Sequence, residues 1–417
     1  MTAPSSATAA TPSLGRIMLL VLLPFGSGYF LSYLFRAVNA VVAPDLVRDI
    51  GLSASGLGLL TAAYLFAFAA FQLPLGILLD RFGPRRVQTV LLLTAATGAL
   101  LFGLADSEIA LIAARAMIGL GFAGGLMASF KAVALWAPPG RMPLLNSWVM
   151  AFGGIGVMAA STPADLAVQA FGWRAVFIAV ACVTALVALA IWVVVPRRGE
   201  AGDAPRERFS QQLKALGTIY SDREFWRVVP IITTMCGSHI AIQTLWAGPW
   251  LADVAGFSRD TVALTLTLMA AAFTVGILGS GALADWVRRF GYGPISVMSA
   301  MTLLFLVSVA GLIVAPSGWV LPLWLLFAAT GQLGILGYPH VSEHFGTALA
   351  GRAGTAVNLL VFGAAFAIQF GIGAVLDRWP SDRGHPPEAY DTAFGIVLAL
   401  LVVTFLWMVL QKPKPRR

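Results

Sequence analysis

Apolar runs long enough to cross a bilayer recur along almost the whole chain, and they constrain its fold more than any other feature. A helix of about 20 apolar residues spans a hydrocarbon core about 30 Å thick. Hydrophobic residues make up 59% of the 417 residues and charged residues only 11%, whereas about a quarter of the residues in a soluble domain are charged. We therefore predict an all-α integral membrane protein that lies in the lipid bilayer.

Polar loops divide the apolar runs into twelve predicted membrane-spanning helices. They cover residues 16–42, 55–79, 86–105, 109–135, 144–168, 174–195, 226–251, 260–284, 292–314, 319–342, 353–376 and 391–411. The first run has no early small-residue cleavage site, so we expect it to be retained as helix 1 rather than removed as a signal peptide. Cys182 and Cys236 lie within apolar runs and indicate no disulfide framework.

The basic residues are distributed unevenly between the two sets of alternating loops. If both termini are cytoplasmic, the cytoplasmic segments carry nineteen Lys and Arg residues and the opposite loops carry five. This asymmetry is the positive-inside pattern of membrane proteins. Because topology explains the net charge of +8, we expect no nucleic-acid partner. The short loops favour a multi-pass protein of a bacterial inner membrane.

The longest polar connection separates helix 6 from helix 7 and divides the chain into two repeated halves. "GILLDRFGPRR" follows helix 2 and "GALADWVRR" follows helix 8, so Gly76 and Asp80 recur 205 residues later as Gly281 and Asp285. Two such halves with a site between them at mid-membrane describe a transporter architecture. We predict two pseudo-symmetric six-helix bundles (16–195 and 226–411) around a central cavity, a cytoplasmic linker (196–225), a disordered N-terminal tail (1–15) and a basic C-terminal tail (412–417).

Three motifs in this order resemble those of the major facilitator superfamily. They are "GILLDRFGPRR" after helix 2, "RAMIGLGFAGG" on helix 4 and "FGWRAVF" at the start of helix 6. The resemblance implies a secondary transporter rather than an enzyme, with the loop after helix 2 as a cytoplasmic latch. The predicted gating or conformational residues, which include ion-pair candidates near the cytoplasmic side, are Gly76, Asp80, Arg81, Gly83, Arg85, Arg86, Arg115, Lys131, Asp285, Arg288 and Glu343.

Polar and aromatic residues form stripes on helices that correspond in the two halves. On helix 1, Tyr29, Tyr33 and Arg36 fall within about 60° of arc, because positions i, i+4 and i+7 share a helix face. Helix 7, the counterpart of helix 1, carries a similar stripe, although such residues also serve simply to bridge helices. The predicted substrate-binding residues are Arg36, Tyr29, Tyr33, Asn39, Tyr64, Gln72, His239, Gln243, Trp246, Asn358 and Gln369.

Arg36 lies well inside helix 1, where a guanidinium exposed to hydrocarbon costs about 3 kcal/mol or more. Pro44 eight residues later, and Gln72 four residues before Gly76, give surroundings that resemble two branches of the superfamily, the anion:cation symporters and the organophosphate:phosphate antiporters. In both branches the arginine of helix 1 binds the anionic group of the substrate, so the resemblance assigns that role to Arg36. The chain lacks the further basic residues of the organophosphate antiporters, which favours a small, singly charged organic anion.

The predicted spans hold no carboxylate near their centres, because Asp165 and Glu343 both lie close to helix ends. If transport is coupled to H⁺, His239 is the residue that titrates near neutral pH; otherwise a proton travels with the substrate, or one anion exchanges for another. His239 can equally be a neutral bridge between helices. For Lys131 we expect either an ion pair with Glu343 that closes the cytoplasmic side or a position at the lipid interface.

Besides a non-transporting receptor on the same fold, two alternative functions stay open. The first is a proton-coupled exporter of amphipathic or drug-like compounds, although helix 5 lacks the Gly-Pro-x-x-Gly-Gly arrangement of drug/proton antiporters. The second is a metal site, because "HVSEH" from His340 to His344 matches a His-x-x-Glu-His metalloprotease pattern. No third metal ligand accompanies that pattern and no Gly-x-x-x-x-Gly-Lys-Ser/Thr motif for ATP occurs. We therefore expect a monomeric transporter with no metal or other cofactor.

Overall fold

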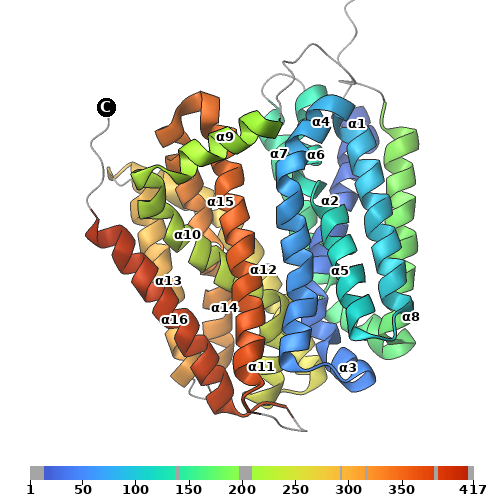
Figure 1. The fold of residues 1–417 in the computed structure, drawn as a ribbon, viewed down its shortest axis with the longest axis vertical. Helices are drawn as coiled ribbons and strands as arrows, with labels where there is room; N and C mark the ends of the chain where they lie inside the picture. Colours follow the sequence, from blue (N-terminus) through green and yellow to red (C-terminus); the bar gives the residue numbers. More distant parts are fainter. Residues whose placement is uncertain are drawn as a thin grey trace, which may run out of the picture.

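The computed structural model of the protein describes residues 14–137, 141–196, 209–291, 294–314, 318–379 and 384–411. These residues form helices joined by short connections, and no β-strand occurs among them. Figure 1 shows the N-terminal half and the C-terminal half side by side, each a bundle of roughly parallel helices. The predicted tails lie outside the described residues except for Leu14 and Gly15. Residues 197–208 of the predicted linker also lie outside them.

The N-terminal bundle begins its long helices with side-chain caps. The Ser53 and Ser107 hydroxyls accept backbone N–H groups at the starts of α4 and α5, which satisfies donors that the helices cannot. In this bundle α4 packs against α5 and α8, and α2 packs against α7. The elements are α1 (Leu14–Ile17), η1 (Met18–Leu22), α2 (Leu23–Ala37), α3 (Asn39–Ile50), α4 (Ala54–Leu104), α5 (Glu108–Phe122), α6 (Gly125–Trp136), α7 (Met142–Ala159) and α8 (Thr162–Val194).

The C-terminal bundle follows the linker helix α9. Asp222 and Ser258 cap the starts of α10 and α12 in the same way as the serines of the N-terminal bundle. Here α10 packs against α15 and α16, and α14 packs against α12 and α13. The elements are α9 (Phe209–Tyr220), α10 (Arg223–Ala241), η2 (Ile242–Trp246), α11 (Ala247–Asp253), α12 (Arg259–Arg288), α13 (Pro294–Val314), α14 (Val320–Thr330), η3 (Leu333–Gly337), α15 (Tyr338–Leu376) and α16 (Pro387–Leu410).

Ten of the described helices are long and apolar enough to cross a membrane. One of them, α4, has 51 residues and contains two predicted spans, which Gly83 separates. The φ of Gly83, 75°, lies in the left-handed region that residues with a side chain rarely adopt. Together with the shorter apolar helix Leu144–Ala159, the described part of the chain accommodates the twelve predicted spans. The all-α membrane fold is confirmed.

The two ends of the bundles, the linker side and the opposite side, carry different connections between helices. The linker side carries α9 and the connections near residues 83, 137, 291 and 346, and it is at the top of Figure 1. The opposite side carries the connections near residues 51, 106, 172, 256 and 378, with α3 and α11 at the bottom of the same view.

Ion pairs and hydrogen bonds join the two bundles near the opposite side. The Arg259 guanidinium of α12 binds Asp45 of α3, with Nη2 and Oδ2 2.9 Å apart, and Asp165 of α8, with Nε and Oδ1 2.6 Å apart. The carboxylate of Asp377, just after α15, accepts the first two backbone N–H groups of α4 at 2.9 and 3.0 Å. The opposite side of the molecule is therefore closed by contacts between the bundles.

Glycines allow helices of one bundle to approach at backbone distance. A Cβ placed on Gly119 of α5 would lie 2.2 Å from the carbonyl oxygen and 2.7 Å from the Cα of Tyr64 on α4. We predict that Gly119→Ala pushes α5 away from α4 and destabilises the protein by about 1–3 kcal/mol, the usual range for overpacking. The thermal unfolding midpoint of the purified protein measures the effect.

A matched control for this substitution is Gly395→Ala on α16, where a Cβ would meet nothing within 4 Å. Alanine is the better helix former, so Gly395→Ala should leave the midpoint unchanged or raise it slightly. Equal midpoints for the Gly119→Ala protein and the wild type would contradict the close helix contact.

Candidate functional site

A cavity of about 140 Å³ lies between the two bundles and is lined by residues of both. On α4, the lining residues Phe68 and Gln72 are closer to the linker side than the hydrogen bonds to Asp377. On α15, Asn358 and Phe362 are likewise closer to the linker side than Asp377. The cavity is thus separated from the opposite side by the contacts that join the bundles.

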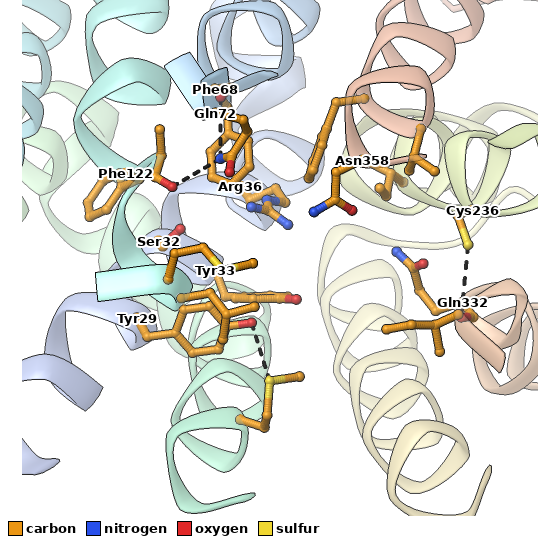
Figure 2. Close-up of a pocket in the computed structure, with 18 of the residues that line it drawn as sticks. Tyr29, Ser32, Tyr33, Arg36, Phe68, Gln72, Phe122, Cys236, Gln332 and Asn358 are labelled. Carbon is orange, nitrogen blue, oxygen red and sulfur yellow. Dashed lines mark hydrogen bonds between the residues drawn. The ribbon is translucent and has the colours of Figure 1, made fainter. Parts of the chain in front are cut away.

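Arg36 enters this cavity from α2 and lies among four aromatic rings. Its guanidinium carbon is 4.8 Å from the ring centroid of Tyr33, 5.0 Å from that of Phe68, 5.4 Å from that of Phe362 and 6.0 Å from that of Tyr64. Figure 2 shows the guanidinium reaching toward Asn358 of the other bundle. Phe362 also comes from that bundle, so the aromatic cage is complete only when the two halves are together.

The charge of Arg36 has no partner of opposite sign in the described part of the chain. The residue is 9% exposed, its Nε makes no hydrogen bond, and no described carboxylate forms an ion pair with it. The four cation–π contacts, at about 0.5–2 kcal/mol each, offset part of the cost of removing a guanidinium from water, but they do not neutralise its charge. The cavity therefore presents a positive charge that an anionic ligand can neutralise.

Two membrane helices are broken beside the cavity, at corresponding places in the two halves. In the N-terminal bundle the break between α5 and α6 frees the Ala123 carbonyl, which accepts the Gln72 amide at 3.0 Å. In the C-terminal bundle the break between α14 and η3 exposes the Gln332 carbonyl to the Cys236 thiol at 3.9 Å. Both contacts are drawn in Figure 2. Irregular backbone at this depth is tolerated where it is buried in protein or lines a cavity.

A second, smaller space of about 30 Å³, the chamber, shares several lining residues with the first, Arg36 among them. His239 and Gln243 line this chamber, and Tyr33, Arg36 and Gln332 line both spaces. These three residues therefore line two spaces of very different size.

The His239 ring is held in a fixed position beside the chamber. It stacks between Phe273 and Phe327, with centroids 5.5 and 5.4 Å away. A Cβ at Gly331 would lie 2.2 Å from the ring, so only glycine leaves room for it there. The carbonyl of Ala328 lies near the ring, but neither ring nitrogen makes a hydrogen bond of normal geometry.

The predicted substrate-binding residues divide into two groups in the structure. Tyr29, Tyr33, Arg36, Gln72 and Asn358 line the large cavity, and His239 and Gln243 line the chamber.

The remaining four predicted residues line neither space and bridge helices instead. Asn39 donates to the Thr61 hydroxyl at 2.8 Å, and Tyr64 donates to the Ser32 carbonyl at 3.2 Å. The Trp246 indole donates to the Gln369 carbonyl at 3.0 Å. Helical periodicity alone does not determine which residues of a stripe face a neighbouring helix. The proposed ligand contacts therefore do not include Asn39, Tyr64, Trp246 and Gln369.

Arg115, a predicted conformational residue, is fully buried behind the cavity. Its Nη2 donates to the Phe35 carbonyl, and its guanidinium carbon is 5.1 Å from the Tyr64 ring centroid. The Tyr64 ring therefore contacts two guanidinium groups, Arg115 and Arg36. This arrangement ties the position of Arg36 to that of α5.

The predicted latch is the loop after helix 2, and its residues lie on either side of the bend of α4 at Gly83. Gly76 and Arg86 are among them. Lys131 of α6 forms its ion pair with Asp80 in this conformation, within the N-terminal bundle and not with Glu343. Arg85 donates to the Trp192 carbonyl at 3.1 Å, and Arg81 lies 5.0 Å from the Phe82 ring centroid.

Three of these predictions stay untested. The pairing of Lys131 with Glu343 concerns a state closed on the linker side. Asp285 and Arg288 belong to α12, but their side chains lie outside the described residues.

The two histidines of "HVSEH" each contact an acid of the same bundle. His340 Nε2 is 2.9 Å from Glu224 Oε1, and His344 Nε2 is 3.0 Å from Asp222 Oδ1. Among the described residues no group of three or more His, Cys, Asp or Glu side chains could hold a metal ion. The pattern is accounted for by contacts between α15 and the start of α10.

The sequence analysis did not single out Phe273, Gln332 and Tyr338, which also line the cavity. Tyr338 donates to the Asn358 amide oxygen at 2.6 Å and so fixes that side chain. The segment "TGQLGILGYP" carried a usable signal, because three glycines in seven residues of a membrane helix indicate a break.

Comparison with known proteins gives two relatives that are described as transporters and one that is described as a multidrug resistance protein. The protein described as "Probable sulfoacetate transporter SauU" of Cupriavidus necator is 26% identical over 280 residues, which are 63% of this chain and 63% of that protein. "Probable galactarate/D-glucarate transporter GudP" of Bacillus subtilis is 24% identical over 405 residues, 89% of each chain. "Multidrug resistance protein Stp" of Mycobacterium tuberculosis is 30% identical over 166 residues, 39% of this chain and 31% of that one.

Solved structures share the arrangement of the helices. A bacterial homologue of the human lysosomal transporter Spinster, in an inward-facing and unoccupied conformation, aligns with a TM-score of 0.70 over 96% of both chains at 17% identity. At that identity the likeness concerns the fold. The model of the protein family described as Major Facilitator Superfamily matches residues 25–369.

Proposed function

The chain belongs to the Major Facilitator Superfamily, and from that premise we propose that it is a secondary transporter of a small organic anion that works by alternating access. Its multi-pass membrane helices and its relatives already identify it as a membrane transporter and not an enzyme.

The observation that carries the proposal is the unpaired guanidinium of Arg36 in a cavity between the bundles. Guanidinium stays protonated at any working pH and offers a planar fork that matches a carboxylate or sulfonate. Because rings from both bundles surround it, an anion bound there contacts both halves. Such a ligand can bias how the halves sit relative to each other.

The size of the cavity supports a small solute. Pockets for drug-sized ligands usually measure about 300–1,000 Å³, whereas this cavity measures about 140 Å³. Two of the relatives are described as transporters of small acids, sulfoacetate and galactarate or D-glucarate. We extend that class of solute, an acid of a few carbon atoms, to this chain.

The closure of the bundles on one side of the cavity supports an alternating-access mechanism. In this conformation the contacts of Arg259 and Asp377 seal the opposite side, and the cavity lies between them and the linker side. With cytoplasmic termini, as the distribution of basic residues favours, the sealed side is the one that faces away from the cytoplasm. We propose a cytoplasmic-membrane location on the same basis.

A drug exporter is the second candidate, because the relative Stp is described as a multidrug resistance protein. Its support is weaker, since the match covers 39% of this chain. The cavity lining also contains a cation and no carboxylate among the described residues, which disfavours cationic amphipathic compounds.

Counterflow in proteoliposomes distinguishes the two candidates. Purified protein is reconstituted with one unlabelled solute inside, and uptake of the same solute in labelled form is measured, for sulfoacetate, D-glucarate and the lipophilic cation tetraphenylphosphonium in turn. We expect accumulation of at least one small anion and none of the cation above protein-free vesicles. Accumulation of the cation alone would contradict the proposal, and the same assay with and without a pH gradient tests coupling to H⁺.

A further inference from the structure

Asn358 of the C-terminal bundle faces Arg36 of the N-terminal bundle across the cavity. Both side chains line the cavity, one from α15 and the other from α2. Phe362 follows Asn358 by one helical turn on the same face of α15, and its ring centroid is 5.4 Å from the guanidinium carbon of Arg36. Figure 2 shows the amide nitrogen of Asn358 turned toward that guanidinium. An anion on Arg36 therefore lies in the part of the cavity that Asn358 also faces.

The Tyr338 hydroxyl determines which end of the Asn358 amide is offered to the cavity. It donates to Asn358 Oδ1 at 2.6 Å, so the amide oxygen is already engaged. The amide nitrogen, which can donate two hydrogen bonds, makes none to a described residue and, unlike Arg36 Nε, is not covered by protein. Asn358 thus presents a donor to the cavity rather than an acceptor.

The backbone brings Tyr338 and Asn358 together from two different membrane spans. Tyr338 is the first residue of α15 and directly follows the break at η3. Asn358 lies beyond the bend of α15 at Gly346, where the chain turns back. The break and the bend therefore place the tyrosine hydroxyl beside the amide.

This orientation of the amide is unfavourable unless an acceptor lies between it and Arg36. A side-chain amide near a cation turns its oxygen, the negative end of its dipole, toward the charge. Tyr338 holds that oxygen, so the positive end of the amide faces the guanidinium instead. A carboxylate has about four lone-pair sites and only accepts hydrogen bonds. It can therefore take the fork of Arg36 and still accept from the Asn358 amide.

We propose that Asn358 is the second anion-binding residue of the cavity and that Tyr338 is the residue that positions its amide as a donor. The acid group accepts from Arg36 of one bundle and from Asn358 Nδ2 of the other, in charge-assisted hydrogen bonds. One ligand group is thereby bonded to both bundles and stabilises the arrangement that brings them together. This inference rests on the proposed function, because it assumes that Arg36 binds the acid group.

Single substitutions test the two roles by equilibrium binding. Titration calorimetry on the purified full-length protein gives Kd for acetate, propionate and sulfoacetate, and the acid that binds most tightly to the wild type is used for every variant. Asn358→Ala should weaken binding about tenfold or more, because hydrogen bonds to a charged group are the stronger kind. Tyr338→Phe keeps the ring but releases the amide, whose oxygen can then turn toward Arg36, and should weaken binding by a similar factor.

A double-mutant cycle distinguishes positioning from direct contact or packing. In the Asn358→Ala background, Tyr338→Phe should change Kd by less than about twofold, because the hydroxyl then has no amide to act on. A hydroxyl that touches the anion itself, or that only supports the packing, would give losses that add. Additive losses would therefore overturn the positioning role of Tyr338.

Asn358→Asp tests the donor directly, at almost unchanged size. The new carboxylate replaces a donor by an acceptor and competes with the ligand for Arg36, so anion binding should fall further than in Asn358→Ala. Tyr220→Phe is the matched control for loss of a tyrosine hydroxyl, because Tyr220 donates to the Ala356 carbonyl at 3.1 Å and lines neither space. Its Kd should equal that of the wild type.

The outcomes separate this inference from the proposed function. Wild-type Kd values for Asn358→Ala and Asn358→Asp would overturn the second anion contact. If Arg36→Gln abolishes binding in that case, the proposed function stands without it. A wild type that binds none of the three acids counts against both.

Discussion

Replacing Arg36 by lysine is expected to lower anion counterflow by about a hundredfold, and replacing it by glutamine should lower it at least as far. Losing one partner of a buried charge pair typically costs 2–5 kcal/mol, and about 1.4 kcal/mol corresponds to a factor of ten. The ammonium of lysine keeps the charge but cannot form the two parallel hydrogen bonds of the guanidinium fork. It also loses the flat contact with the rings of Tyr33 and Phe362.

The control for Arg36 is an arginine outside the cavity. Arg174 binds Asp106 and the Ala105 carbonyl at the opposite side, so Arg174→Lys should transport at a rate close to that of the wild type. Normal counterflow by the Arg36→Lys protein, with equal amounts of reconstituted protein, would show that the anion does not bind to this residue.

Replacing Arg259 by glutamine should shift the protein away from the conformation described here. The substitution leaves Asp45 and Asp165, whose side chains are 6% and 3% exposed, without their shared partner between the bundles. A buried carboxylate that loses its partner is strongly disfavoured, but Arg48 still contacts Asp45 and Gln169 still contacts Asp165. Because of these remaining contacts, we expect a shift of about tenfold rather than several thousandfold toward the state open on the opposite side.

Spin-label distances measure that shift. Labels at Asp106→Cys and Glu388→Cys, in a background without Cys182 and Cys236, lie on exposed positions of the two bundles at the opposite side. Arg259→Gln should increase the population of longer distances. Arg48→Gln is the control, because among the described residues Arg48 pairs with Asp45 and Asp49 of its own helix alone, and this substitution should leave the distances unchanged. Identical distance distributions for Arg259→Gln and the wild type would mean that this ion pair does not hold the side closed.

Much of the fold could be predicted because its determinants are repeated and local. Long apolar runs dictate helices in a bilayer, and the recurrence of Gly76 and Asp80 after 205 residues revealed the two halves. The bend at Gly83 falls in the predicted connection between residues 79 and 86, whereas the breaks beside Ala123 and Gln332 were harder to predict. A break depends on the groups that receive the freed carbonyls, such as the Gln72 amide, and these come from other helices.

The candidate site was predictable only to the level of helix faces. Helical periodicity places Arg36 and Tyr33 on one stripe, but it does not fix how far each helix is rotated toward the centre. That rotation determines that Gln72 faces the cavity and that Trp246 is buried against α15. The chamber is beyond prediction from single helices, since it arises where Arg36, His239 and Gln332 meet from three separate segments.

The most direct test of the central claim is an experimental structure of the protein with the anion that gives the highest counterflow. We predict that its acid group lies within hydrogen-bonding distance of the Arg36 guanidinium, about 3 Å, with the rings of Tyr33, Phe68 and Phe362 around the pair. The anion bound elsewhere between the bundles, with Arg36 unchanged and unpaired, would contradict the account.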